Sequence, residues 1–154
     1  MARSQWVIAL GLMVGLGGTA IAQAAPNTEG GIDHRQWKIT ITPDEAAKQQ
    51  GEKAGRDALV FRDGKLISKG CGRYGFGPST YTANQSGSTW TFNTEQTSPN
   101  KGNTSWSGQI SGNTITGTML WTKKNGNAIH YSFAGQRARP FWTKLTHLFS
   151  KTPS

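Results

Sequence analysis

Apolar and polar side chains alternate along much of the chain, and short turn-forming stretches separate the alternating runs. Trp37, Ile39 and Ile41, for example, are each followed by a polar residue. A period of two places successive side chains on opposite faces of an extended chain, so each run predicts a β-strand with one buried face. The runs predict eight strands, near residues 36–42, 57–62, 65–69, 79–83, 88–95, 104–111, 114–122 and 128–134.

The stretches between the runs indicate how the strands connect. Asp63–Gly64 lies between two strands and favours a tight hairpin, because both central residues of that turn need positive φ angles. The alternation stops at residues 43–50, where Thr42 suits an N-cap and Pro43 suits the first helical position, so one or two helical turns are expected. Residues 70–78 contain four glycines and predict a loop.

Consecutive short strands without a long helix predict an all-β antiparallel meander. Eight strands are about the number that closes into an up-and-down barrel, and closure removes exposed sheet edges; an open sandwich is the alternative architecture. Gly108 and Gly117 fall inside predicted strands, where a missing side chain allows a sharp bend or a close approach. The expected inward side chains are Trp37, Ile39, Ile41, Leu59, Phe61, Tyr81, Trp90, Phe92, Trp106, Ile110, Ile115, Met119, Trp121, Ile129, Tyr131 and Phe133.

The pattern outside the predicted barrel divides the chain further. Residues 1–24 combine a basic start, an apolar run and small residues ending in A-x-A, which predicts a signal peptide cleaved after Ala22 or Ala24 and export to the periplasm or the medium. Residues 25–34 form a flexible lead and residues 35–136 the barrel domain. Residues 137–154 form a basic tail with apolar residues at helical spacing, which predicts a short helix packed on the barrel or a membrane-surface anchor.

The composition agrees with an all-β domain, and the charges are distributed unevenly along the chain. Hydrophobic residues make up 34% of the 154 residues and charged residues 16%, a profile that fits neither a helical bundle nor a disordered chain. The net charge is +9, and no acidic residue follows Glu95. A basic C-terminal half is typical of contact with anionic envelope components, although it also occurs in basic proteins without such a partner, and nucleic acid is not expected outside the cytoplasm. The candidate contacts are Lys123, Lys124, Arg137, Arg139, Lys144 and Lys151.

Residues with catalytic or metal-binding chemistry are sparse. Cys71, the single cysteine, is a candidate reactive thiol because Lys69 and Arg73 would favour its thiolate; a half-buried structural thiol at the barrel mouth is the favoured alternative. The three histidines have no metal-ligand spacing. No nucleophile elbow, P-loop or dinucleotide motif is present. We therefore expect no catalytic residues, no metal, no cofactor and no enzyme activity, and we expect a monomer.

Aromatic residues are the main candidates for ligand contact. Indole and phenyl rings on the inner face can hold a small apolar or aromatic ligand, or they can fill the interior as core. So many rings would crowd an eight-stranded barrel, so any cavity is expected to be small. The candidate ligand contacts are Trp37, Trp90, Trp106, Trp121, Tyr131 and Phe133.

The arrangement resembles the calycin group, which includes lipocalins and small lipocalin-like barrels of secreted bacterial proteins. The resemblance rests on Trp37 in the first strand, on the run from Ser105 to Met119 and on the closing run from Tyr131 to Gly135. It implies an eight-stranded barrel that binds a small hydrophobic ligand. It also implies a basic residue after the last strand that packs over Trp37, for which Arg137 and Arg139 are the candidates.

Overall fold

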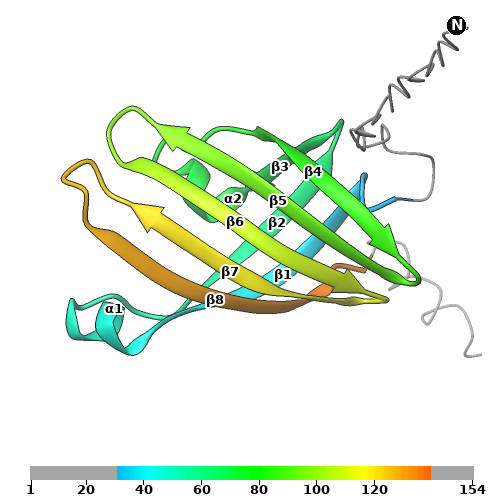
Figure 1. Cartoon of the computed structure of the whole chain (residues 1–154), viewed down its shortest axis with the longest axis horizontal. Helices are drawn as coiled ribbons and strands as arrows, with labels where there is room; N and C mark the ends of the chain where they lie inside the picture. The colour runs from blue at the N-terminus through cyan, green and yellow to red at the C-terminus, as the bar shows by residue number, and fades with distance from the viewer. Residues whose placement is uncertain (1–30, 140–154) are drawn as a thin grey trace, which may run out of the picture.

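A closed antiparallel barrel forms most of the part of the chain that the computed structural model describes, residues 31–139 (Figure 1). It confirms the predicted barrel and excludes the open sandwich. The elements are β1 (Arg35–Pro43), α1 (Glu45–Gln49), β2 (Gly55–Arg62), β3 (Lys65–Ser68), α2 (Lys69–Gly72), β4 (Ser79–Ser86), β5 (Thr89–Ser98), β6 (Gly102–Ser111), β7 (Thr114–Thr122) and β8 (Ala128–Arg137).

Each strand pairs with its neighbour in sequence, and β8 pairs with β1 to close the ring. The closing register places Ile41 opposite Phe133 and Trp37 opposite Arg137. All eight predicted strands are present, and most bounds differ by one to three residues. The order is up-and-down throughout. Every strand of the described barrel is therefore hydrogen-bonded to a neighbour on both sides, apart from short strand ends.

The inner face carries the core, as the alternation predicts. Ile41, Trp90 and Trp121 are only partly buried, and they pack against the core. The core also takes Ile32, Ala47, Leu66 and Phe76, which the sequence pattern did not assign to the inner face. Thirteen of the sixteen side chains predicted to point inward are buried: Trp37, Ile39, Leu59, Phe61, Tyr81, Phe92, Trp106, Ile110, Ile115, Met119, Ile129, Tyr131 and Phe133.

Aromatic rings fill the middle of the barrel. The ring of Phe61 packs edge-on against Phe92 with centroids 5.0 Å apart, and Trp106 packs against Phe133 at 5.5 Å. Such pairs add about 0.5–1.5 kcal/mol each beyond the area they bury. The central lumen is therefore a packed core, and space for a ligand is confined to an end.

Gly108 and Gly117 face each other across β6 and β7. A Cβ atom on Gly108 would lie 2.8 Å from the ring of Phe92, and one on Gly117 would lie 2.5 Å from the ring of Phe133. The predicted close approach at these two glycines is thus confirmed, and the approaching groups are core aromatic rings and backbone.

The predicted helical turns after the first strand are confirmed as α1, although their cap differs from the prediction. The N-cap of α1 is Asp44, whose Oδ1 accepts a hydrogen bond from the backbone N–H of Ala47 at 2.7 Å. Thr42 and Pro43 instead belong to β1, because both pair with β8. The second helix, α2, lies in the segment predicted as a loop, and the side chain of Ser68 caps it by accepting from the N–H of Cys71.

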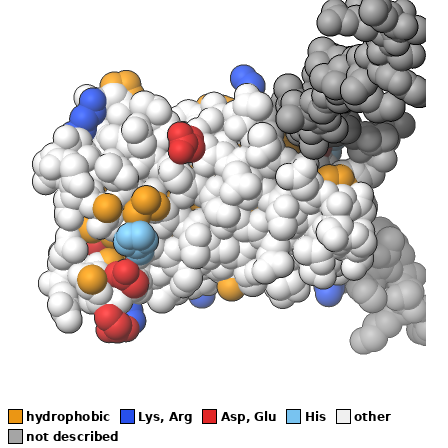
Figure 2. Space-filling model, in the orientation of Figure 1, with side chains coloured by type: hydrophobic (Ala, Val, Ile, Leu, Met, Phe, Trp, Pro, Cys, Tyr) orange, Lys and Arg blue, Asp and Glu red, His pale blue; other side chains and the backbone are white. Residues whose placement is uncertain are grey.

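The outer face of β4 to β8 is polar and carries few charges (Figure 2). A shallow hollow of about 400 Å³ on this face is lined mainly by hydroxyl and amide side chains such as Thr80, Asn93 and Ser107. His130 lies on this face, as alternation predicts, and is exposed. No helix within residues 31–139 is both long enough and apolar enough to cross a membrane.

Candidate functional site: a cavity at the barrel mouth

The two ends of the barrel are built differently. At one end, called the mouth here, lie α1, α2 and the connections β5–β6 and β7–β8 (left in Figure 1). At the other, called the closed end, lie the start of β1 and the turns after β2, β4 and β6. Ile32 and Trp37 are fully buried near the start of β1, so large apolar side chains fill the closed end.

A cavity of about 430 Å³ opens at the mouth. This size lies within the range of about 300–1,000 Å³ that is typical of small-molecule sites. Its apolar wall consists of Ile41, Phe76, Met119, Trp121 and Tyr131. Its charged side chains are Glu52, Lys53, Arg56, Asp57 and Arg73.

A hydrogen-bonded chain runs along one side of the cavity. The hydroxyl of Tyr131 donates to Oε2 of Glu52 at 2.9 Å, and Nζ of Lys123 lies 3.1 Å from Oε1 of the same carboxylate. Lys123 also sits 4.7 Å from the ring centroid of Trp121, whose indole N–H donates to the carbonyl of Lys101 at 2.8 Å. These contacts connect the segment after α1 to β7 and β8, and they fix two of the aromatic rings in the cavity wall.

Asp57 fixes α2 on the opposite side. Its Oδ1 accepts from the N–H groups of Ala58 at 2.6 Å and Gly70 at 2.5 Å, and its Oδ2 accepts from the hydroxyl of Ser68. A four-residue helix has little stability of its own, so these tertiary contacts rather than local propensity hold α2 in place. The result is that Cys71 faces the cavity.

Cys71 is a half-buried thiol at the mouth. Burial is the main cause that raises the pKa of this thiol above the ordinary value; the hydrogen bond with Ser68 acts in the opposite direction, and the negative charge of Asp57 adds a smaller increase. Lys69 and Arg73 are exposed, and burial acts against the thiolate that their charges were expected to favour. The geometry agrees with the alternative of a neutral thiol in the wall.

A short segment over the mouth carries Phe76 into the core. Polar side chains of β5 hold it: Nε2 of Gln96 donates to the carbonyl of Gly77 at 2.7 Å, and the hydroxyl of Ser98 donates to the carbonyl of Tyr74 at 2.7 Å. Oε1 of Gln96 also accepts from the indole N–H of Trp106 at 3.1 Å. These inward polar residues were not predicted, because an alternation test looks only for apolar side chains on that face.

The structure separates the six predicted ligand contacts into two groups. Trp121 and Tyr131 line the mouth cavity. Trp37, Trp106 and Phe133 are buried core residues, and Trp90 is partly buried near the start of β5, toward the closed end. Glu52 and Asp57 were not recognised as site residues, since no local motif marks them and only the closed ring brings them near Tyr131.

The predicted anionic-surface residues do not gather in one place. Lys123 and Lys124 lie at the mouth, and Lys123 is paired with Glu52. Arg137 and Arg139 lie at the closed end, where Arg137 is the cross-strand neighbour of Trp37. Lys144 and Lys151 lie outside the described residues, as do the predicted signal peptide and most of the tail. Contact with an anionic envelope component stays a prediction, which retention on anionic vesicles would test.

Arg137, one of the two basic residues that the calycin resemblance named, is the cross-strand neighbour of Trp37. Trp37, opposite it, is fully buried, and its indole N–H has no hydrogen-bond partner within the described residues. Burial and the nearby charge of Arg137 lower the pKa of Arg35, which points to two guanidinium groups near one another at this end.

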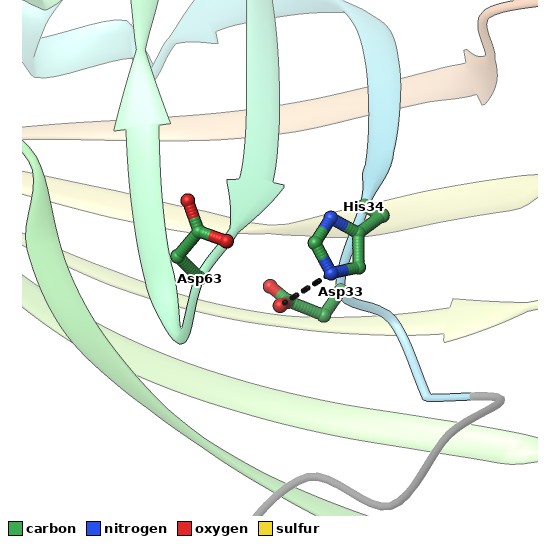
Figure 3. A group of neighbouring side chains, drawn as sticks. All are labelled: Asp33, His34 and Asp63. Atoms are coloured by element: carbon green, nitrogen blue, oxygen red, sulfur yellow. Dashed lines mark ion pairs between the residues drawn. The ribbon is translucent and has the colours of Figure 1, made fainter.

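Asp33, His34 and Asp63 form a second cluster, at the closed end (Figure 3). Their ligand-type atoms lie within 4.8 Å of one another. Asp33 is already used for structure: its carboxylate accepts from the hydroxyl of Tyr81 at 3.1 Å and from the N–H of Gly64 at 3.3 Å. His34 and Asp63 are exposed, so the cluster mainly ties the start of β1 to the β2–β3 turn.

The chain was compared with protein-family models, with curated proteins and with solved structures, and none of the three comparisons gives a match. The conclusions about fold therefore rest on the barrel itself, which is compatible with a calycin-like fold.

Proposed function

We propose that the protein is an exported, non-enzymatic, lipocalin-like barrel that binds one small ligand with an apolar or aromatic part in the mouth cavity. The observation that carries the proposal is the contrast between the two parts of the interior. Aromatic core fills the middle and the closed end, whereas a cavity of about 430 Å³ remains at the mouth. Sites of this kind combine apolar walls with a few placed polar groups.

The wall of the cavity supports binding rather than catalysis. The two groups that could act as nucleophile or base, Cys71 and Tyr131, both have raised pKa values, for which burial is the main cause. Glu52 has both oxygens engaged, by Lys123 and by Tyr131. Groups held in this way position a ligand, but they offer no free base or nucleophile at neutral pH.

Intrinsic fluorescence tests the proposal. A neutral hydrophobic probe, N-phenyl-1-naphthylamine, is titrated into the protein while indole emission and energy transfer to the probe are followed. Binding at the mouth predicts that Trp121→Phe loses most of the ligand-dependent change. Trp90→Phe is the matched control, because Trp90 is also a partly buried indole but does not line the cavity.

Saturable binding with the signal carried by Trp121 supports the proposal. A probe that does not bind, or a signal lost in Trp90→Phe and kept in Trp121→Phe, contradicts it. Circular dichroism and thermal unfolding of both variants show whether a lost signal reflects lost folding, and a variant that fails to fold is replaced by Met119→Trp, which narrows the cavity and should weaken binding.

A further inference from the structure

The charges around the mouth cavity are not balanced. Lys53, Arg56 and Arg73 are exposed and lie around the opening. No ion pair within residues 31–139 involves any of these three side chains. Unpaired cations that converge on one opening raise the local concentration of anions there.

The two carboxylates in the same cavity are already neutralised or fully hydrogen-bonded. Lys123 pairs with Glu52 at 3.1 Å, and Tyr131 donates to its other oxygen. Asp57 accepts two backbone N–H groups and the hydroxyl of Ser68. Neither carboxylate is therefore free to bind a cationic ligand, and the pairing with Lys123 reduces the repulsion that Glu52 would exert on an anion.

Two further titratable groups in the wall, the thiol of Cys71 and the phenol of Tyr131, add no negative charge at neutral pH. The raised pKa values of Cys71 and Tyr131 keep the thiol and the phenol protonated. The excess charge around the cavity is therefore positive and lies at the opening, while the apolar side chains Met119, Phe76 and Ile41 lie in the wall.

We propose that the ligand is an anionic amphiphile, with its apolar body against Met119, Trp121 and Tyr131 and its anionic head at Lys53, Arg56 and Arg73. The inference rests on the proposed function, since it names the class of ligand for the same cavity. A carboxylate and a phosphate monoester present the same chemistry to lysine and arginine, and a simple alkyl chain serves for the apolar body.

The test uses three ligands with the same ten-carbon chain, namely decanoate, decyl phosphate and decanol, with decyltrimethylammonium as the cationic counterpart. Affinities are measured below the micelle concentration by displacement of N-phenyl-1-naphthylamine. In 50 mM NaCl we expect the anions to bind about tenfold more tightly than decanol, because exposed ion pairs each contribute modestly. In 500 mM NaCl the preference should shrink because the cations are exposed and screened.

The double variant Arg56→Gln/Arg73→Gln should lose most of the preference for the anions and keep the affinity for decanol. Lys65→Gln is the matched control, because Lys65 is an exposed cation on β3 that does not line the cavity, and its removal should leave the preference unchanged. A larger effect for decyl phosphate or for decanoate identifies the preferred head group, and either result supports the proposal.

The possible failures can be told apart. If the probe and all four ligands fail to bind, the proposed function itself is wrong. If decanol, the anions and the cation bind equally, or if the double variant keeps the anion preference, the protein binds small ligands but the anionic class is wrong.

Discussion

Replacing Gly117 by alanine should destabilise the barrel strongly, although it adds one methyl group. The new Cβ would lie 2.2 Å from the carbonyl oxygen of Ser107, 2.5 Å from the ring of Phe133 and 2.6 Å from the Cα of Gly108. Two of these three atoms are backbone of the neighbouring strand, so a rotamer change cannot relieve the overlap. Overpacking a core costs about 1–3 kcal/mol, and a backbone clash places this variant at about 3 kcal/mol or more.

The matched control is Gly55→Ala in β2. Gly55 also lies in a strand and has ordinary φ, but no atom lies within 4 Å of its added Cβ. Glycine in a strand interior is about 0.5–1 kcal/mol less favourable than alanine, so this variant should be neutral or slightly more stable. The two Gly→Ala changes are thus expected to have opposite signs.

Urea unfolding followed by indole fluorescence measures both variants, and thermal unfolding checks them. A loss of about 3 kcal/mol should lower Tm by about 10–20 °C for a domain of this size. Equal m-values show that the comparison concerns the same unfolding transition. The reasoning would be refuted if the free energies of unfolding of Gly117→Ala and Gly55→Ala agreed within about 0.5 kcal/mol, because the strand contact then tolerates a side chain.

Three further predictions concern polar and titratable side chains of the barrel. Gln96→Met should lower the free energy of unfolding by about 1–3 kcal/mol, since it removes the amide that accepts from the buried indole N–H of Trp106 and donates to the carbonyl of Gly77; urea unfolding measures this, and an unchanged midpoint would contradict it. Cys71 should react with a disulfide reagent more slowly in the native protein than in urea at pH 8, because its pKa is raised; equal rates would argue against a half-buried thiol. Folding also raises the pKa values of Tyr81 and Tyr131, mainly because both phenols are buried. The two neutral phenols therefore stabilise the native state below the ordinary tyrosine pKa, and this stabilisation is lost as the pH rises above about 10. Urea midpoints between pH 8 and 11 should fall less for the double Tyr→Phe variant than for the unsubstituted protein.

The strands could be predicted well from the sequence because apolar and polar side chains alternate within most of them. Alternation identified the inner face in most strands where that face is apolar, as at Trp37 and Ile39. It predicted the end of β5 too early, because the inward residues there are Thr94, Gln96 and Ser98, which are buried but polar. Their partners come from other segments, so a single strand's sequence contains no sign of their burial.

The mouth cavity could not be predicted in the same way. Glu52, Asp57, Cys71 and Tyr131 come from four separate segments, and only the barrel register brings them together. The helix α2 depends on Asp57, thirteen residues before Gly70, rather than on helical propensity in a glycine-rich stretch. The sequence therefore predicted the scaffold and two of the aromatic wall residues, whereas the polar part of the site required the structure.

The seam between β1 and β8 has a practical consequence for protein engineering. The N–H of Ala138 donates to the carbonyl of Gln36 at 2.8 Å, so the two ends of the described barrel meet at the closed end. A short linker could join them, and new termini could be cut at the β4–β5 turn around Gly87, which lies at the same end. In such a circular permutant each strand would keep its two neighbouring strands. A reporter fused to the original termini of the barrel, or to the new termini of the permutant, would lie at the closed end and leave the mouth open to a ligand.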